Sequence, residues 1–303
     1  MHIPHIPVLP TEVEDAFAEI DGGYIVDCTV GYGGHSEILL SSNPHIKMLC
    51  IDQDDEALAF SKKRLEAYHD RVTFLKGRFA SVIKQLEGYD IRGVLADIGV
   101  SSLQLDKMDR GFSFESETLD MRMDSAHTLD AYAVVNHYTK EELEDIFHLY
   151  GEVREYKKLA DIIVKQRDIE PFTSAKALSD FIAKHMYAKK IHPATLAFQA
   201  IRIEVNDELG ELKELLESIK NLNLSNCLVA IISFHSLEDR IVKQTFKEWS
   251  RRCICPPQVM RCLCGNDHDM GKVVTKKPII PSGEEIVSNP RSRSSKLRIF
   301  HIK

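Results

Sequence analysis

Short apolar runs alternate with amphipathic segments along the first hundred residues. Runs rich in Val, Ile, Leu and Ala predict strands, and segments with helical periodicity between them predict helices. The strands are expected at residues 24–30, 47–52, 72–75 and 93–98, and the helices at 36–41, 55–68 and 80–86. Strands that are apolar on both faces are typical of a parallel sheet covered by helices on each side. The pattern therefore predicts an α/β fold.

The alternation stops near residue 106, and helical patterns follow. Thr139 and Glu142 form a capping box at the start of one of these helices. Pro193 precedes a pattern whose apolar positions continue to Ile219, which predicts one long helix. We expect residues 106–191 to form an all-helical insertion.

The α/β pattern resumes after the insertion. A strand is expected at 227–234, a helix follows to about Trp249, and two β-rich runs cover 272–279 and 296–302. We therefore expect one discontinuous α/β domain, made of residues 1–105 and 192–303.

A glycine cluster follows the first predicted strand. Gly31, Gly33 and Gly34 lie where an open α/β sheet binds its ligand, and glycine lets the backbone approach a ligand closely. Asp52 ends the second strand, where a carboxylate can accept hydrogen bonds from ribose hydroxyls. A Rossmann dehydrogenase shares both features, but the third glycine of its motif would fall at Ser36. The pattern indicates a nucleotide cofactor and leaves a nicotinamide cofactor as the alternative.

Asp97 follows the fully apolar run of the fourth predicted strand. At the carboxyl end of that strand it could accept a hydrogen bond from an exocyclic amine, and its alternative role is to cap the next turn. Phe79 could stack on an adenine or pack in the core. His35 is expected at the start of a helix, where capping is the simpler role.

Polar residues also follow the strand at 227–234. Ser236 and Asp239 predict a helix cap, and His235 is a candidate substrate contact at the same sheet edge.

Two aromatic residues in the insertion, Phe112 and Phe114, have Arg110 and Arg122 nearby. They could stack on and anchor a flipped base, or pack in the core of the insertion.

The longest motifs resemble one family. VDCTVGYGGHS, LADIGVSSLQLD, RGFSF, LDMRMD, FQAIRIEVNDEL, SFHSLEDR and NPRSRS, in this order, are similar to segments of the bacterial 16S rRNA cytosine-N4 methyltransferases, the RsmH/MraW family. His5, Pro7, Val8 and Leu9 match the family's N-terminal signature, so the resemblance covers nearly the whole chain. It implies a class I S-adenosylmethionine-dependent methyltransferase fold (a Rossmann-like sheet) with an inserted helical domain for substrate recognition. It also implies methylation of the N4 amine of one cytidine in the decoding region of 16S rRNA.

The resemblance also assigns site residues. Asp97 would be catalytic, and the contacts to S-adenosyl-L-methionine would be Gly33, Gly34, His35, Asp52, Phe79, Asp97 and Gln104. The chain departs from the family pattern at Leu196 and Ala197, where the family usually has Arg and Thr. RNA contacts from these two positions are not carried over.

The expected chemistry needs no metal, because a sulfonium methyl is already activated for displacement. The N4 lone pair of cytosine is delocalised into the ring, so the enzyme must hold the amine in line and favour its pyramidal form. Asp97 accepting one N–H would do this, and the base must leave its stack to reach the site. An NAD-linked oxidoreductase and a non-catalytic RNA-binding assembly factor are the rival interpretations.

Four cysteines cluster near the C-terminus in the pattern C-x-C-x6-C-x-C, namely Cys253, Cys255, Cys262 and Cys264. Zinc sites usually use wider pairs, so free thiols and a zinc site both stay open and we predict no metal. An odd total of seven cysteines in a chain of this size indicates reduced thiols and a cytoplasmic protein.

The net charge of −7 is unevenly distributed. Residues 251–303 hold 11 Lys or Arg and four Asp or Glu, a net of +7, and the rest of the chain carries −14. Arg291, Arg293, Lys296 and Arg298 flank the last predicted strand, where they could contact RNA phosphates or form a solvated edge. We expect 16S rRNA, within the small ribosomal subunit, as the partner, with Arg291, Arg293 and His235 as substrate contacts. We expect no membrane partner, and a homodimer stays open.

Overall fold

The computed structural model describes residues 6–100, 102–189, 191–256, 258–259 and 261–303. His5 of the N-terminal signature lies outside this range. The chain forms two compact units, a sheet unit of residues up to 99 with 211–303 and a helical unit of residues 100–210. The sequence pattern places the boundaries after residues 105 and 191 instead. The second division lies further along the chain because helix α10 packs against α6 and α7 of the helical unit.

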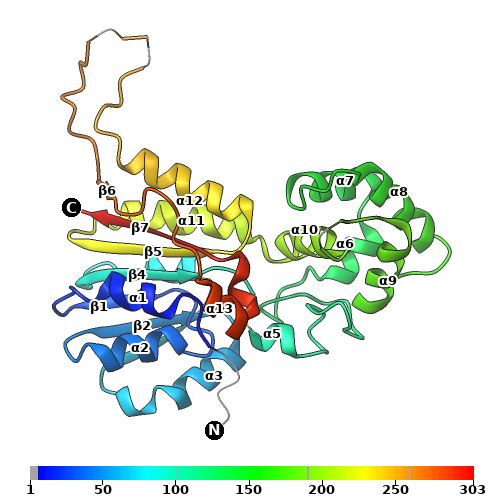
Figure 1. The fold of residues 1–303 in the computed structure, drawn as a ribbon, viewed down its shortest axis with the longest axis horizontal. Helices are drawn as coiled ribbons and strands as arrows, with labels where there is room; N and C mark the ends of the chain where they lie inside the picture. Colours follow the sequence, from blue (N-terminus) through cyan, green and yellow to red (C-terminus); the bar gives the residue numbers. More distant parts are fainter. Residues whose placement is uncertain (1–5, 101, 190, 257, 260) are drawn as a thin grey trace. The chain divides into compact units, whose positions relative to one another are not determined.

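The sheet unit is built on seven strands in the order β3-β2-β1-β4-β5-β7-β6 (Figure 1). The first five strands in this order pair in parallel, whereas β7 runs antiparallel to β5 and β6 antiparallel to β7. The strands are β1 (Tyr24–Asp27), β2 (Lys47–Asp52), β3 (Val72–Lys76), β4 (Ile91–Asp97), β5 (Cys227–Ser233), β6 (Gly271–Val273) and β7 (Lys296–Ile302). The strand order reverses between β1 and β4, and an open sheet of this kind binds ligands at such a point. This is the Rossmann-like sheet that the sequence predicts.

Helices cover both faces of this sheet because its strands bury side chains on both sides. Val26 and Ile51 share one apolar cluster with α4, α11 and α12, and Ile25 and Cys50 share another with α1, α2 and α3. These helices are α1 (Pro10–Phe17), α2 (Gly34–Ser42), α3 (Asp55–Arg64), α4 (Phe79–Ile83), α11 (Glu208–Asn221) and α12 (Ser236–Trp249). The remaining short elements are η1 (Glu66–Tyr68), α13 (Gly283–Ser288) and η2 (Pro290–Ser294). Side chains alternating between the faces therefore build two cores around one sheet.

The helical unit packs around its own apolar cluster, which includes Val135, Phe147, Ile163, Ile182 and Ile201. Its helices are α5 (Ser102–Asp106), α6 (Ala131–His137), α7 (Lys140–Leu149), α8 (Tyr156–Arg167), α9 (Ala175–His185) and α10 (Thr195–Asn206). The capping box that the sequence predicts at Thr139 and Glu142 is present at the start of α7. Among the described residues, no helix has both the length and the apolar composition that a membrane span needs.

The predicted long helix after Pro193 is wrong in its continuity. Two helices, α10 and α11, meet at Asp207, whose backbone has a left-handed φ of 50°. Asp is one of the few residues that tolerate this conformation. A Cβ on Gly210 would lie 2.3 Å from an oxygen of the Asp207 carboxylate, so glycine at this position leaves room for that side chain. Apolar periodicity continues across the turn because each helix buries a face of its own. The periodic pattern therefore does not reveal the break between the two helices.

Candidate active site

A hydrogen-bonded network underlies the edge where β1 and β4 end. Asp27, the last residue of β1, is buried and accepts hydrogen bonds from Ser36 Oγ at 2.6 Å and Thr29 N at 3.2 Å. Thr29 Oγ1 in turn accepts one from Asp97 N at 2.7 Å. Burial raises the pKa of Asp27. The network ties the glycine loop after β1 to the end of β4.

The catalytic candidate Asp97 lies beside His35 at this edge. His35 Nε2 is 3.7 Å from Asp97 Oδ2, and the two side chains are 8% and 21% exposed. Within the described part of the chain, Asp97 Oδ1 and both imidazole nitrogens of His35 are shielded from solvent and have no hydrogen-bond partner. Buried polar atoms are nearly always hydrogen-bonded, so an unsatisfied group of this kind indicates a ligand or solvent that completes it. The structure thus brings together two of the predicted site residues around open hydrogen-bonding positions.

Asp52 ends β2 and faces the same glycine loop. Its carboxylate accepts hydrogen bonds from Gly31 N at 2.9 Å and Asp54 N at 2.9 Å, yet the side chain stays partly exposed. Burial raises the pKa of Asp52 to about 6. A carboxylate has about four lone-pair positions, so this one retains acceptor capacity for the hydroxyls of a ribose.

The two glycines predicted to contact the cofactor have different structural reasons for being glycine. Gly33 precedes α2 with a left-handed φ of 74°, a conformation that favours glycine. A Cβ on Gly34 would lie 3.2 Å from the ring of Pro7, so Gly34 lets the N-terminal segment pack closely. Gly34 is therefore explained by contact within the protein as well as by its place in the loop.

Phe79 and Gln104, the remaining predicted cofactor contacts, lie in different units. Phe79 begins α4 and packs in part against the core of the sheet unit. Gly77 N donates to Asp52 O at 3.0 Å, which places the loop before Phe79 next to the end of β2. Gln104 is buried in the helical unit. Its role toward a cofactor stays a prediction.

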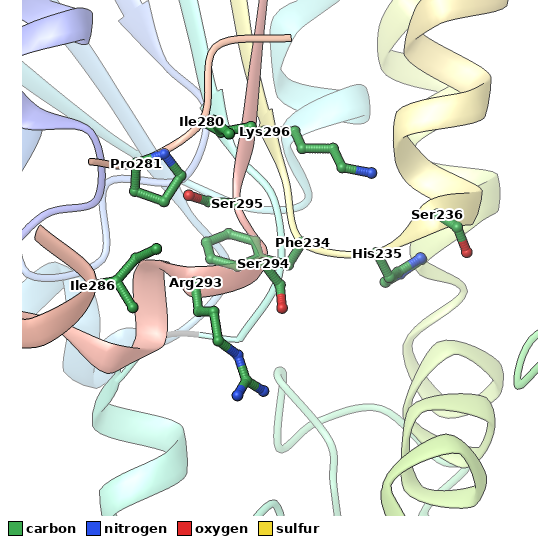
Figure 2. Close-up of a pocket in the computed structure, with 10 residues that line it drawn as sticks. All are labelled: Phe234, His235, Ser236, Ile280, Pro281, Ile286, Arg293, Ser294, Ser295 and Lys296. Carbon is green, nitrogen blue, oxygen red and sulfur yellow. The ribbon is translucent and has the colours of Figure 1, made fainter. Parts of the chain in front are cut away.

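A pocket of about 320 Å³ opens beside the end of β5 (Figure 2). Figure 2 shows His235 and Ser236 entering from the start of α12 and Arg293 and Ser294 entering from η2. It is lined by Phe234, His235, Ser236, Ile280, Pro281, Ile286, Arg293, Ser294, Ser295 and Lys296. A Cβ on Gly99 would lie 3.3 Å from the Phe234 ring, so the pocket wall reaches the segment that follows Asp97. Two predicted substrate contacts, His235 and Arg293, thus share one pocket.

The helix cap predicted at Ser236 and Asp239 is wrong by one position. His235 is the N-cap of α12, and its Nδ1 accepts a hydrogen bond from Glu238 N at 3.4 Å. The buried Glu238 carboxylate accepts from Phe234 N at 2.8 Å and His235 N at 3.2 Å, which completes a capping box. An imidazole nitrogen acts here as the acceptor usually supplied by Ser, Thr, Asp or Asn.

Comparison with protein families shows which family the chain belongs to. The model of the MraW methylase family matches residues 2–303. The chain belongs to the MraW methylase family. Ribosomal RNA small subunit methyltransferase H of Aliarcobacter butzleri (strain RM4018) is 63% identical over 300 residues, covering 99% of each chain. The protein of the same name from Sulfurimonas denitrificans (strain ATCC 33889 / DSM 1251) is 57% identical over 306 residues, again covering 99% of each.

Similarity to solved structures is lower. The Precorrin-6y C5,15-methyltransferase from Geobacter metallireducens GS-15 aligns over 97% of this chain and 87% of its own, with a TM-score of 0.44 and 9% identity.

The basic residues around the last strand of this MraW-family chain divide into two groups. Arg291 and Arg293 are exposed on η2. Arg298 is buried in β7, where its guanidinium donates to both Asp239 oxygens at 2.6 and 3.2 Å, and Lys296 Nζ lies 3.7 Å from the same carboxylate. The structure therefore assigns Arg298 to the fold and removes it from the predicted RNA-contact cluster.

The aromatic and arginine residues of the insertion serve its packing. Phe112 is buried, and the Phe114 ring contacts Phe198 with ring centroids 4.8 Å apart. Arg110 donates to the carbonyls of Arg122 and Met123 at 3.1 and 3.0 Å. Among the alternatives left open by the sequence, the structure favours core packing.

Arg122, Leu196 and Ala197 also make contacts within the helical unit. Arg122 pairs with Asp120, with a shortest distance of 2.7 Å. Ala197 is buried in the helical core, and Leu196 packs partly against it.

The sequence did not predict a role in the site for Asp27 or Thr29. Both belong to VDCTV, where the signal was an acid at the end of an otherwise apolar strand. Only the structure shows that Thr29 links Asp27 to Asp97.

Proposed function

We propose that this chain transfers the methyl group of S-adenosylmethionine to the N4 amine of a cytidine in small-subunit rRNA. The name of its relatives, at 63% and 57% identity over nearly the whole chain, supports a small-subunit rRNA substrate. The main support for the proposed chemistry is the His35–Asp97 pair at the carboxyl end of β4. Among the described residues, Asp97 Oδ1 and both ring nitrogens of His35 are buried and have no hydrogen-bond partner.

The residues at the glycine loop fit S-adenosylmethionine. Asp52 would accept hydrogen bonds from the ribose hydroxyls, because its oxygens retain acceptor capacity beyond Gly31 N and Asp54 N. Phe79, which follows the loop that Gly77 ties to Asp52 O, would contact the adenine. When bound, the cofactor supplies a methyl group already activated for transfer, and the described residues need only position the nucleophile.

Asp97 would activate that nucleophile. Its Oδ1, which has no hydrogen-bond partner among the described residues, would accept one N–H of the cytosine amine, which favours the pyramidal form and directs the N4 lone pair. Thr29 fixes the backbone of Asp97, and Asp27 fixes Thr29, so the carboxylate is held before substrate arrives. The proton lost from N4 passes to Asp97 or to solvent.

The pocket beside β5 would receive the target nucleotide. Phe234 offers an aromatic wall next to Gly99, and a base must be unstacked to reach Asp97. Exposed Arg293 at the pocket and Arg291 nearby on η2 would bind the flanking phosphates. The helical unit would recognise the surrounding RNA. We place the reaction at the decoding region of 16S rRNA within small ribosomal subunits, in the cytoplasm.

The direct test is to identify the methylated nucleoside. Small subunits from a strain that lacks this methylation are incubated with the protein and methyl-labelled S-adenosylmethionine, and the RNA is digested to nucleosides. We expect all label in N4-methylcytidine from one position of 16S rRNA. Label in another nucleoside would contradict the proposed reaction. RNA binding without any transfer would favour a non-catalytic assembly factor.

A further inference from the structure

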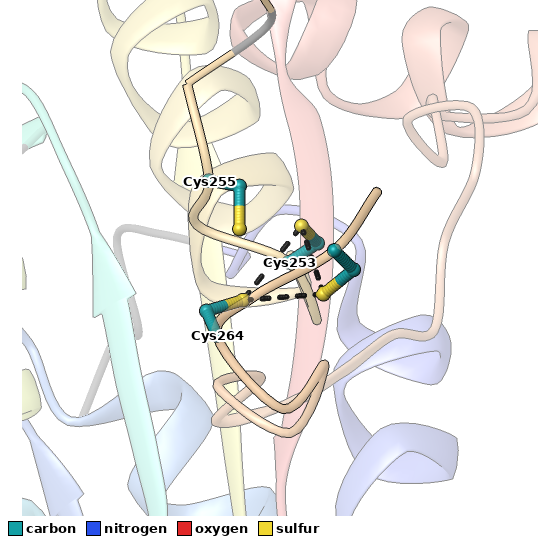
Figure 3. A group of neighbouring side chains, drawn as sticks. Cys253, Cys255 and Cys264 are labelled. Carbon is teal, nitrogen blue, oxygen red and sulfur yellow. Dashed lines mark hydrogen bonds between the residues drawn. The ribbon is translucent and has the colours of Figure 1, made fainter. Parts of the chain in front are cut away.

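A long loop connects α12 and β6 (Figure 1). It brings four cysteine sulfurs together. The Sγ atoms of Cys253, Cys255, Cys262 and Cys264 all lie within 4.8 Å of one another. Three of their separations are 3.6 Å (Cys253 to Cys262), 3.6 Å (Cys262 to Cys264) and 3.7 Å (Cys264 to Cys253). Figure 3 shows Cys253 and Cys255 on one limb of the loop and Cys264 on the other, with their sulfurs turned toward a common centre.

These distances match a tetrahedral metal site. A zinc ion with four thiolate ligands at about 2.3 Å places its sulfurs about 3.8 Å apart, whereas a disulfide needs about 2.05 Å. Cys253, Cys262 and Cys264 form a nearly equilateral triangle of that edge length, which corresponds to one face of such a tetrahedron. We infer that Cys253, Cys255, Cys262 and Cys264 bind one structural Zn²⁺ ion.

A backbone N–H group donates to one sulfur of the cluster, as suits a thiolate. Leu263 N donates to Cys255 Sγ at 3.3 Å. Four thiolates and one Zn²⁺ carry a net charge of −2, and such donors offset it. Arg252 and Arg261 each directly precede a cysteine of the cluster, which adds positive charge nearby.

The described apolar side chains of the loop do little to order its outer part. Ile254 is 60% exposed and Leu263 is 80% exposed, so neither of these two side chains is buried in a core. Its base is closed by backbone hydrogen bonds from Met270 N to Trp249 O at 2.8 Å and from His268 N to Arg252 O at 3.1 Å. The cysteines begin immediately beyond this base. A metal that joins both limbs would hold the loop where apolar burial does not.

The spacing of the four cysteines explains why the sequence alone does not decide between a zinc site and free thiols. The C-x-C pairs are tighter than the usual zinc pairs, and each pair alone resembles two thiols in a turn. The backbone instead folds one pair against the other across the loop. A closed set of four soft sulfur ligands, with no open position, suits zinc in a structural role and offers no site for catalysis.

The test is metal analysis of the full chain purified under reducing conditions without a chelator. We expect one zinc per chain, and a visible cobalt–thiolate absorption when Co²⁺ replaces it. Cys262→Ser and Cys264→Ser should each lower zinc content by roughly tenfold or more. Cys227→Ala, which changes a buried cysteine of β5 outside the cluster, should retain the metal. Thermal unfolding of each variant establishes that the sheet unit is folded.

A second readout follows the loop itself. Trypsin cuts after Arg252 and Arg261, on either side of the loop tip, and removal of zinc should raise cleavage there by roughly tenfold. Zinc that is absent, or that is unchanged in the Cys262 and Cys264 variants, would overturn the proposal. Stoichiometric iron, or two disulfides in the protein as purified, would overturn it as well.

Discussion

Two acidic residues near the glycine loop differ in what their oxygens are free to do. Asp27 is buried and accepts hydrogen bonds from Ser36 Oγ and Thr29 N, so it positions the loop and, through Thr29, Asp97. Within the described part of the chain, Asp52 accepts hydrogen bonds only from the backbone N–H groups of Gly31 and Asp54, and part of its surface is exposed. The same chemical group therefore has a positioning role at one strand end and a proposed ligand-binding role at the next.

The raised pKa of Asp52 makes cofactor binding sensitive to pH. Its carboxyl ionises at about 6 instead of 3.8, because burial penalises the charge. The ionised form is the better acceptor for ribose hydroxyls, so the affinity for S-adenosylmethionine should fall about tenfold per pH unit below that value. Calorimetric titration between about pH 5 and pH 8 measures this dependence.

The control for this pH effect is a nearby exposed acid. Asp52→Asn should bind more weakly and flatten the pH profile, whereas Asp55→Asn should leave the profile unchanged, since Asp55 is exposed and bonded to Lys76 at 2.6 Å. An unchanged pH profile in Asp52→Asn would remove Asp52 from the cofactor site.

The folding stability of the protein without ligand depends on pH in the opposite direction to the cofactor affinity. The raised pKa stabilises the fold fully below 3.8, and that contribution is lost as pH rises through about 6.

At the scale of single elements, the start of α12 combines a structural role with the pocket. His235 caps the helix through Glu238 N and also lines the cavity beside β5. A loss of activity in a His235 variant therefore has two possible causes, a damaged helix or a lost substrate contact. The helix start and the site must be separated by variants that keep the cap.

His235→Ala should lower the free energy of unfolding by about 1 kcal/mol, because the N-cap acceptor is removed. His235→Asn restores a side-chain acceptor and should recover most of that stability while methyl transfer stays impaired. Thr139→Ala, which removes the cap of α7, should cost a similar amount of stability without slowing transfer. Chemical denaturation and a methyl-transfer assay on the same samples measure both. Full activity of His235→Asn would limit His235 to capping.

Helices and strands were predicted correctly where interactions between residues close in the sequence determine them. The apolar strands β2 and β7 match the predicted ranges residue for residue, and the Thr139 capping box is present. The break at Asp207 was missed, because apolar periodicity continues through it. The antiparallel direction of β7 was also not predictable, since strand direction depends on the path of the chain through the sheet.

The positions of the candidate site residues were predictable to a similar extent. Glycine-rich turns and acids at strand ends mark a sheet edge, so the places of Asp52 and Asp97 at the ends of two strands could be predicted. The linkage from Asp97 through Thr29 to Asp27 is a tertiary contact with no sequence pattern of its own. The cap at His235 was misplaced because imidazole rarely takes that role.

At the scale of the whole molecule, charge is separated along the chain. The net charge of −7 combines −14 with +7 from residues 251–303. Local charge governs a binding site, whereas net charge governs solubility and long-range steering. The burial of Arg298 against Asp239 narrows the basic surface further. We therefore expect restricted RNA contact and weak binding of arbitrary RNA.

Arginine variants separate the RNA surface from the fold. Arg293→Ala should weaken RNA binding across sequences and reduce the slope of log affinity against log salt by about 1, without changing stability. Arg298→Ala should instead destabilise the fold by about 3 kcal/mol, because it leaves Asp239 without its buried partner. Filter binding at several salt concentrations and denaturant titration measure the two effects. The reverse pattern would show that the assignment of these residues is wrong.

Single-turnover methyl transfer by Asp97→Asn tests the proposed mechanism directly. Cofactor and RNA affinities are measured on the same preparation. The substitution keeps the shape of the side chain and removes its charge. We predict that transfer slows by roughly a hundredfold or more while both affinities stay within about threefold. Asp90→Asn, at the opposite end of β4, should transfer at the normal rate. Normal transfer by Asp97→Asn would contradict the proposed mechanism.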